Sequence, residues 1–229
     1  MTNRPVALVT GATRGIGRAI AVELSSTHRI LVGGRDATRV GGLVAELHDA
    51  APFVCDLTDE GALATASAGI GWLDVLVHSA GIGRSNDIGA ASRALWREVF
   101  ETNVFAVADL TRLLLPALEA ARGIVVAINS GAGFFSSPGG AVYAGSKFAL
   151  RALTDALREE MRGKVRVCSI HPGRTDTDMQ RELQAAMGNE HYNGSCYVSP
   201  GSVAAAVRLA VDTPDNATVE QLSIRPSVF

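Results

Sequence analysis

Tyr143 and Lys147 stand four residues apart, and Ser130 precedes the tyrosine by thirteen residues. Residues four apart on an α-helix share one face, so we expect the lysine ammonium beside the phenol. A cation about 4 Å away contributes roughly 4 kcal/mol at an effective dielectric of about 20. That energy lowers a tyrosine pKa by roughly three units, to near 7. With the Ser130 hydroxyl bonded to a substrate oxygen, such a phenol is suited to general acid–base catalysis on a carbonyl or an alcohol.

Each of these residues also has an ordinary explanation when it is taken alone. A Tyr-x-x-x-Lys pair is often a partly exposed feature of a helix, and serine is common in turns. Ser130 is not a hydrolase nucleophile elbow, because G-x-S-x-G requires glycine where Ile128 stands. The catalytic interpretation therefore depends on finding the three residues together with a cofactor site.

A glycine-rich turn near the start of the chain supplies that site. Gly11, Gly15 and Gly17 lie between a continuous apolar run, 6–10, and a helical stretch. Glycine tolerates positive φ and lets a phosphate approach the backbone, and the next helix directs free N–H groups at the anion. The spacing differs from the commoner G-x-G-x-x-G, and no Gly-Lys-Ser/Thr makes it a P-loop. The turn predicts dinucleotide binding, the alternative being a turn that merely needs glycines.

The end of the second expected strand indicates which dinucleotide. An acidic residue there would accept hydrogen bonds from a ribose 2′-hydroxyl, but this chain has Gly33-Gly34-Arg35-Asp36. Arg35 can pair bidentately with a 2′-phosphate, and Arg14 in the turn can approach the same group. Asp36 is expected to cap a helix, although rotation of the loop could offer its carboxylate to a ribose. NADP(H) is favoured, and NAD(H) remains possible.

The elements that must position these residues alternate between β and α type. Repeated βα units predict an α/β fold with a parallel sheet and helices on both faces. No linker divides residues 1–229, so a single dinucleotide-binding and catalytic domain is expected. The longest predicted helix, 92–118, is interrupted or ends near Pro116. The strands are expected at 6–10, 29–33, 52–55, 73–77, 123–129, 165–170 and 219–224.

Composition excludes several function classes. The chain has 229 residues and a formal net charge of −2, from 21 basic and 23 acidic residues. That balance gives no electrostatic footprint for nucleic acid or an anionic membrane. The three cysteines lack disulfide or metal spacing, and neither a signal peptide nor a spanning apolar stretch is evident. We expect a cytoplasmic protein with reduced thiols, a small-molecule substrate and no metal.

These motifs resemble the short-chain dehydrogenase/reductase family over nearly the whole chain. Residues 10–17 match the family's T-G-x-x-x-G-x-G, and Ser130, Tyr143 and Lys147 match its catalytic positions. The resemblance implies a Rossmann-type domain with a seven-stranded parallel sheet. It adds Asn103 as a catalytic residue that holds a proton-relay water, the alternative being a surface asparagine. It assigns these residues to the cofactor: Gly11, Thr13, Arg14, Gly15, Ile16, Gly17, Arg35, Asp56, Leu57, Ala80, Gly81, Tyr143, Lys147, Pro172, Gly173 and Thr177.

The chain departs from the family's pattern at one motif, and one segment resembles the part of the family that covers the substrate. His78-Ser79-Ala80-Gly81 replaces the family's N-N-A-G, and His78 is interpreted as a hydrogen-bonded core residue. Residues 176–198 resemble the family's lid. Apolar and aromatic side chains there and after Ser130 suggest a modest-sized, partly hydrophobic carbonyl substrate, or else they only pack the lid. They are Phe134, Phe135, Met179, Leu183, Met187, Tyr192 and Tyr197.

The resemblance also implies an activity and an assembly. The expected activity is NADP(H)-dependent interconversion of a carbonyl and an alcohol, with Tyr143 as general acid and base. A homodimer or homotetramer is expected, and helices 92–118 and 142–161 are candidates for its interface. Two other functions stay open from the residues: a non-catalytic NADP(H)-binding regulatory protein, and a Rossmann-type methyltransferase. A methyltransferase usually has an acid after the second strand and has no use for Tyr143 with Lys147.

Overall fold

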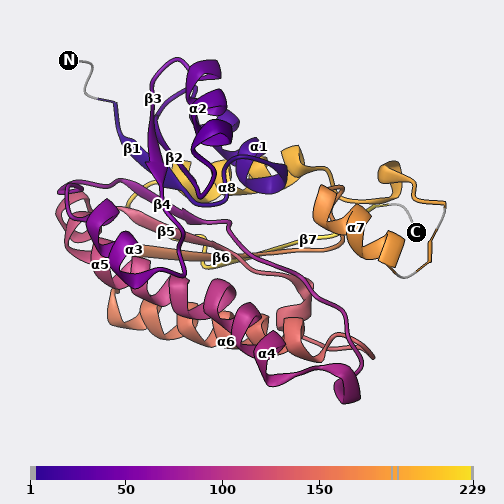
Figure 1. Cartoon of the computed structure of the whole chain (residues 1–229). Helices are drawn as coiled ribbons and strands as arrows, with labels where there is room; N and C mark the ends of the chain where they lie inside the picture. Colours follow the sequence, from indigo (N-terminus) through magenta and orange to yellow (C-terminus); the bar gives the residue numbers. More distant parts are fainter. Residues whose placement is uncertain (1–3, 187, 190, 228–229) are drawn as a thin grey trace.

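The computed structural model describes residues 4–186, 188–189 and 191–227 (Figure 1). A seven-stranded sheet has the order β3-β2-β1-β4-β5-β6-β7, and every neighbouring pair is parallel. The predicted α/β fold class is therefore confirmed, and each predicted strand occurs within two residues of its expected boundaries. The strands are β1 (Val6–Val9), β2 (Arg29–Gly34), β3 (Ala50–Val54), β4 (Val75–His78), β5 (Ile124–Ile128), β6 (Arg166–Pro172) and β7 (Gln221–Ile224).

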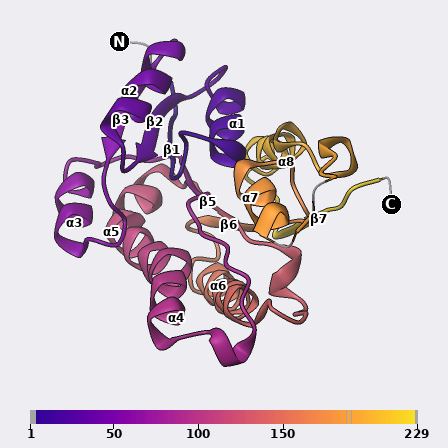
Figure 2. The same cartoon turned by 45° about the vertical axis from the view of Figure 1, so that its right-hand side comes forward.

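Helices cover both faces of the sheet because successive strand residues are apolar on both sides. In β1, Ala7 and Val9 pack on one face against a layer that contains α1 (Gly15–Leu24), α2 (Ala37–Glu46) and α8 (Pro200–Asp212). Leu8 points to the other face, against α3 (Glu60–Ser67), α5 (Ala106–Ala121) and α6 (Ala141–Glu160). Figure 2 shows the two layers on opposite sides of the strands.

The long helical segment after β4 breaks at a different place from the one predicted. A π-helical segment, Glu101–Phe105, separates α4 (Arg93–Phe100) from α5, and α5 continues through Pro116 to Ala121. The prediction of an interruption or end near Pro116 is wrong. A proline removes one helical hydrogen bond, but here both Pro116 and Arg112, whose carbonyl loses its partner, are exposed to solvent. Leu114 and Leu118 keep the helix packed on the sheet.

The segment between β6 and α8 lies at the carboxyl ends of the strands. It contains α7 (Asp178–Ala186), which Figure 1 shows in orange near the C-terminus. A bridge between Thr175 and Val198 joins the two ends of the segment. Met187 lies outside the described residues. Within the described chain, no helix combines the length and the apolar character that crossing a membrane requires.

Candidate active site

Ser130, Tyr143 and Lys147 meet where β5 ends beside the first turns of α6. Ser130 follows the last paired residues of β5, and its Oγ accepts a hydrogen bond from the Ala132 amide at 3.1 Å. Tyr143 and Lys147 lie one turn apart on α6, as their spacing predicts. A side-chain hydrogen bond from Ser130 acts on the phenol and lowers its pKa. The structure therefore brings the three residues together.

Lys147 is buried and points beneath the phenol ring. Its Nζ lies 5.8 Å from the ring centroid and donates to the Ile128 carbonyl at 3.0 Å. Burial lowers the pKa of this lysine from 10.5 to about 8, because a low-dielectric site disfavours the charged form. Near pH 7 the Lys147 side chain is still charged, and one of its N–H groups is already bonded to a backbone carbonyl.

The pKa of Tyr143 moves opposite to the sequence-based expectation. Burial raises it above its ordinary value of 10.0, and the hydrogen bond from Ser130 only partly opposes that shift. The predicted lowering to near 7 is therefore wrong for the chain without a nucleotide. The prediction assumed an ammonium about 4 Å away with no competing partner, whereas Lys147 is bonded to Ile128 and sits by the ring.

Asn103 is buried inside the π-helical segment and is not a surface residue. Its Oδ1 accepts from the Ile82 amide at 2.9 Å, and its Nδ2 donates to the Ile82 carbonyl at 2.9 Å and to Ser146 Oγ at 3.0 Å. Ser146 in turn donates to the Tyr143 carbonyl at 2.7 Å. Both amide hydrogens are used, so a relay water would need a remaining oxygen lone pair of Asn103, on its side chain or its backbone.

A cavity of about 720 Å³ opens at the carboxyl ends of β1, β2 and β4. Gly11 and Gly15 adopt positive φ values of 62° and 55°, and a Cβ at Gly17 would collide with the Gly11 carbonyl. These backbone features fit the phosphates of a dinucleotide. The residues assigned to the cofactor that line the cavity are Gly11, Thr13, Arg14, Gly15, Ile16, Gly17, Arg35, Asp56, Leu57, Ala80, Gly81 and Thr177.

Several arginines line this cavity. Arg14, Arg35 and Arg39 are among them. Asp36 caps α2, as predicted, since its Oδ1 accepts from the amides of Thr38 and Arg39 at 3.0 and 3.1 Å. Sequence reasoning missed Arg39, which lies in the first turn of α2, close in the chain to Arg35.

Asp56 also lines the cavity. Its Oδ1 accepts from the Thr58 amide at 3.0 Å and from the Thr58 hydroxyl at 2.8 Å. These two bonds, followed by the charge of Arg35, hold the pKa of Asp56 below its ordinary value. The carboxylate is therefore ionised and fixed in place at neutral pH.

The aromatic side chains expected to form substrate walls mostly pack elsewhere. Tyr192 and Tyr197 stack on each other with centroids 4.8 Å apart, and Phe134 packs on His171 at 4.3 Å. Among the apolar residues predicted to contact the substrate, Met179 does line the cavity, and it lies over Gly83, beside Tyr143. An ion pair of 3.6 Å between Arg14 and Glu182 also joins the glycine turn to α7.

A model of the family described as short chain dehydrogenase matches residues 5–188. The chain belongs to the short-chain dehydrogenase family. It is 33% identical to serine 3-dehydrogenase of Agrobacterium fabrum, over 96% of this chain and 92% of that protein. It is 31% identical to farnesol dehydrogenase of Aedes aegypti, over 96% of this chain and 95% of that protein.

A solved structure supports the same relation. Alcohol dehydrogenase from the archaeon Thermococcus sibiricus, complexed with 5-hydroxy-NADP, matches with a TM-score of 0.89 at 26% identity. The match covers 98% of this chain and 97% of that chain. As a member of the short-chain dehydrogenase family, the protein is an oxidoreductase of CH–OH or C=O groups.

His78, the departure from the family's asparagine, is a core residue as predicted. Its Nε2 lies 2.9 Å from Thr111 Oγ1, whose hydroxyl donates to the Val107 carbonyl at 2.7 Å. The histidine must therefore donate from Nε2. Burial lowers its pKa to about 4, so His78 stays neutral and links β4 to α5.

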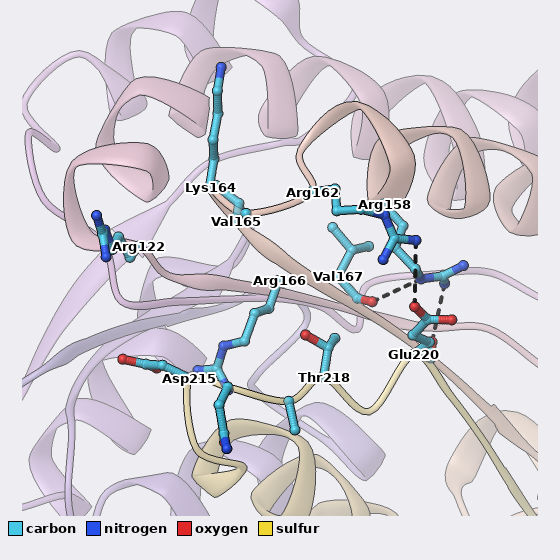
Figure 3. A pocket seen from close by; sticks show the side chains of 13 residues that line it. Arg122, Arg158, Arg162, Lys164, Val165, Arg166, Val167, Asp215, Thr218 and Glu220 are labelled. Atoms are coloured by element: carbon cyan, nitrogen blue, oxygen red, sulfur yellow. Dashed lines mark hydrogen bonds and ion pairs between the residues drawn. The ribbon is translucent and has the colours of Figure 1, made fainter.

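A second cavity, of about 330 Å³, lies at the opposite edge of the sheet, beside the start of β6 (Figure 3). Arginines dominate its lining, but several already bond the protein. Arg158 donates to the carbonyls of Val167 and Glu220 at 3.1 Å each, and Arg166 donates to the Thr213 carbonyl at 2.6 Å. Because these guanidinium groups already bind backbone carbonyls, they are less available to a ligand. We therefore place the chemistry of this short-chain dehydrogenase at the cavity of about 720 Å³, which contains the glycine turn.

Proposed function

We propose that the protein is an NADP(H)-dependent oxidoreductase that interconverts a carbonyl and an alcohol, with Tyr143 as general acid and base. One observation carries the proposal. Lys147 of the Ser130–Tyr143–Lys147 cluster lies beside Gly81, and Gly81 lines a cavity that also has the glycine turn and three arginines, Arg14, Arg35 and Arg39, along its wall. The parts needed for proton transfer and for nucleotide binding therefore occur at the same edge of one sheet.

Ser130 and Tyr143 bind the substrate oxygen in this mechanism. NADPH, when bound, supplies the hydride that reduces the carbonyl carbon. Tyr143 delivers the proton to the oxygen, and Ser130 holds that oxygen and orients it toward the phenol. Lys147 stabilises the phenolate that remains, and a water on Asn103 returns the proton. Oxidation of the alcohol uses the same groups in reverse.

The elevated pKa of Tyr143 suits one direction of this reaction. A phenol whose pKa lies above 10 is protonated at neutral pH, which is the state that a general acid requires for carbonyl reduction. The reverse oxidation requires the phenolate, so we expect it to speed up as pH rises. Bound NADP⁺ carries a positive nicotinamide, and its charge would favour the phenolate.

The choice of nucleotide rests on the arginines that line the cavity. Arg14 and Arg35, with Arg39, provide guanidinium groups for a 2′-phosphate. Asp36 is engaged as a helix cap and so offers less to a ribose hydroxyl. The Thermococcus sibiricus relative bound to 5-hydroxy-NADP supports the same preference.

The substrate is proposed to be a small to medium, partly hydrophobic ketone, aldehyde or secondary alcohol. The relatives' names refer to serine and farnesol, which differ in size and polarity. What they share is the reacting group, so their names support the reaction type more strongly than any one substrate. Met179 is the apolar side chain best placed to contact the substrate.

We also propose that the protein forms a homodimer or homotetramer through the helices after β4 and β5. Phe105 is 52% exposed and Phe148 is 44% exposed, and they lie next to α5 and on α6. Exposed aromatic residues on neighbouring helices are typical of an interface. Light scattering at micromolar concentration tests the assembly.

Titration and turnover test the function. Calorimetric titration with NADPH, NADH and S-adenosylmethionine should give tightest binding for NADPH, and binding of S-adenosylmethionine alone would instead support a methyltransferase. A panel of ketones and aldehydes, followed by NADPH absorbance, should reveal turnover that Tyr143→Phe removes. NADPH binding without turnover on any carbonyl would instead support a regulatory protein.

A further inference from the structure

His171 occupies a buried position behind Ser130, and the reaction described above does not use it. It lies in β6, has no exposed surface, and packs on the ring of Phe134 at 4.3 Å. Its Nδ1 is 3.0 Å from the Ser130 carbonyl oxygen, and its Nε2 is 3.0 Å from Ser169 Oγ. The imidazole thus connects the end of β5 to the interior of β6.

The two partners determine which ring nitrogen carries the proton. A carbonyl oxygen can only accept, so Nδ1 must donate to Ser130, and Nε2 of the neutral ring then accepts from the Ser169 hydroxyl. Burial, followed by the charges of Arg151 and Arg225, lowers the pKa of His171, while the bond to Ser130 opposes this. The ring is neutral at physiological pH, and both of its nitrogens are engaged.

The bond to Ser130 replaces a missing strand contact. Pairing of β5 with β6 ends at Ile128 and Ile170, and the Asn129 amide makes the last backbone bond, to the Ile170 carbonyl at 2.7 Å. Beyond it, Ser130 has no partner strand, and its carbonyl is bound by the His171 side chain instead. The direction of the Ser130 hydroxyl depends on this backbone, since it is set by the residue's φ, ψ and χ1.

Neighbouring groups hold the imidazole itself. The His171 carbonyl accepts from Arg225 Nη1 at 2.6 Å, and the Phe134 ring contacts both the His171 ring and the Arg151 guanidinium, which is 4.5 Å from the Phe134 centroid. Such packing restricts the ring to one orientation.

We propose that His171 is a positioning residue for Ser130, which fixes the serine backbone so that the hydroxyl points at the phenol of Tyr143. The inference rests on the proposed function, because it concerns the same active site. His171 does not touch the reacting atoms in this scheme, and its effect passes through the carbonyl of Ser130.

The test uses the full chain with two substitutions, one that keeps an aromatic ring but removes the N–H donor and one that removes the ring but keeps an N–H donor. His171→Phe keeps an aromatic ring against Phe134 but has no N–H, whereas His171→Asn places an amide N–H near the position of Nδ1. We expect His171→Phe to lower kcat by about ten- to a hundredfold, the scale of a small misplacement of a catalytic group. NADPH affinity should stay unchanged, and His171→Asn should recover most of kcat.

His78→Asn is the matched control, because it alters another buried, hydrogen-bonded histidine that does not touch Ser130. It should leave kcat unchanged. If His171→Phe does not fold, Ser169→Ala provides a milder variant, since it removes only the hydroxyl that orients the imidazole. A several-fold loss of kcat is expected there, and an unchanged kcat would contradict the inference.

A second readout does not depend on turnover. Ser130-Gly131 is the only Ser-Gly pair in the sequence, so ¹³C-carbonyl serine with ¹⁵N-glycine marks the Ser130 carbonyl alone. Its chemical shift should move in His171→Phe and stay in His78→Asn. The inference is overturned if the shift does not move, if kcat is unchanged, or if NADPH affinity falls as much as kcat. A wild-type protein that reduces no carbonyl would refute the proposed function, while the carbonyl shift would still report on the hydrogen bond.

Discussion

The nucleotide half and the proton-transfer half of the site use different parts of the chain. Around β1, α1 and β2 the cavity is lined by five glycines, two of them at positive φ, and by the N-terminus of α1. Around β5 and α6 the chemistry depends on side chains, above all the half-buried Tyr143 and the buried Lys147. Backbone geometry can be inferred from residue type, because few residues other than glycine adopt it. The protonation of a buried side chain depends instead on its whole surroundings.

The largest effect should come from removing the phenol oxygen. Tyr143→Phe is expected to lower carbonyl reduction by about a hundred- to ten-thousandfold, the usual contribution of a general acid. NADPH affinity should be nearly unchanged, because Tyr143 is not among the residues that line the nucleotide cavity. Stopped-flow reduction and fluorescence titration measure the two quantities on one sample. A variant that loses both would contradict the division between the halves.

The complementary change is at Gly17, where a Cβ has no room. Gly17→Ala should destabilise the fold by about 1–3 kcal/mol, as overpacking does, and should weaken NADPH binding because the turn must shift away from the Gly11 carbonyl. Urea denaturation and NADPH titration measure these effects.

Gly41→Ala serves as the control for that substitution. Gly41 lies within α2 and has open space around its Cβ position. Alanine there should stabilise the helix by about 0.5–1 kcal/mol, with unchanged NADPH affinity. If the two variants bind NADPH equally well, the glycine turn is not the phosphate site.

The buried ammonium of Lys147 should cost stability in a pH-dependent way. Its folded pKa of about 8 lies below the ordinary value of 10.5. Below pH 8 the lysine is charged in both the folded and the unfolded protein, and the full cost of burying the ammonium applies. Between pH 8 and 10.5 the folded protein releases the proton first, so the penalty decreases and disappears above that range.

Lys147→Met measures this penalty. The variant should be more stable than the wild type at pH 7 by on the order of 1–3 kcal/mol, after the unpaired Ile128 carbonyl is taken into account. The difference should shrink toward pH 10.5. Lys164→Met, at the other lysine of the sequence, is the control, since Lys164 makes an exposed pair with Glu119. A stability difference that does not change with pH would mean that it does not come from removing the charge of Lys147.

Much of this site could be predicted from the sequence, and the exceptions have physical causes. Apolar runs determined the strands, and the glycine turn indicated the cavity. The π-helical segment around Asn103 could not be predicted, because the Asn103 side chain there is bonded to Ile82 and Ser146, which are far from it in the sequence. His171 was missed as well, although Ser169 and His171 are two residues apart in β6 and therefore point to the same face of the sheet. Which partners a buried polar residue meets is decided by tertiary packing.

The smallest expected effect tests how much the arginines add to nucleotide binding by the glycine turn. Arg35→Ala should weaken NADPH binding by about tenfold and leave NADH binding unchanged, because only the 2′-phosphate uses the guanidinium. Arg14 and Arg39 remain in the cavity and limit the loss. Arg29→Ala is the matched control, since Arg29 begins β2, pairs with Asp49 at 3.7 Å and does not line the cavity. Equal losses for NADPH and NADH would mean that Arg35 supports the loop rather than the phosphate, and the preference would then depend on Arg14 and Arg39.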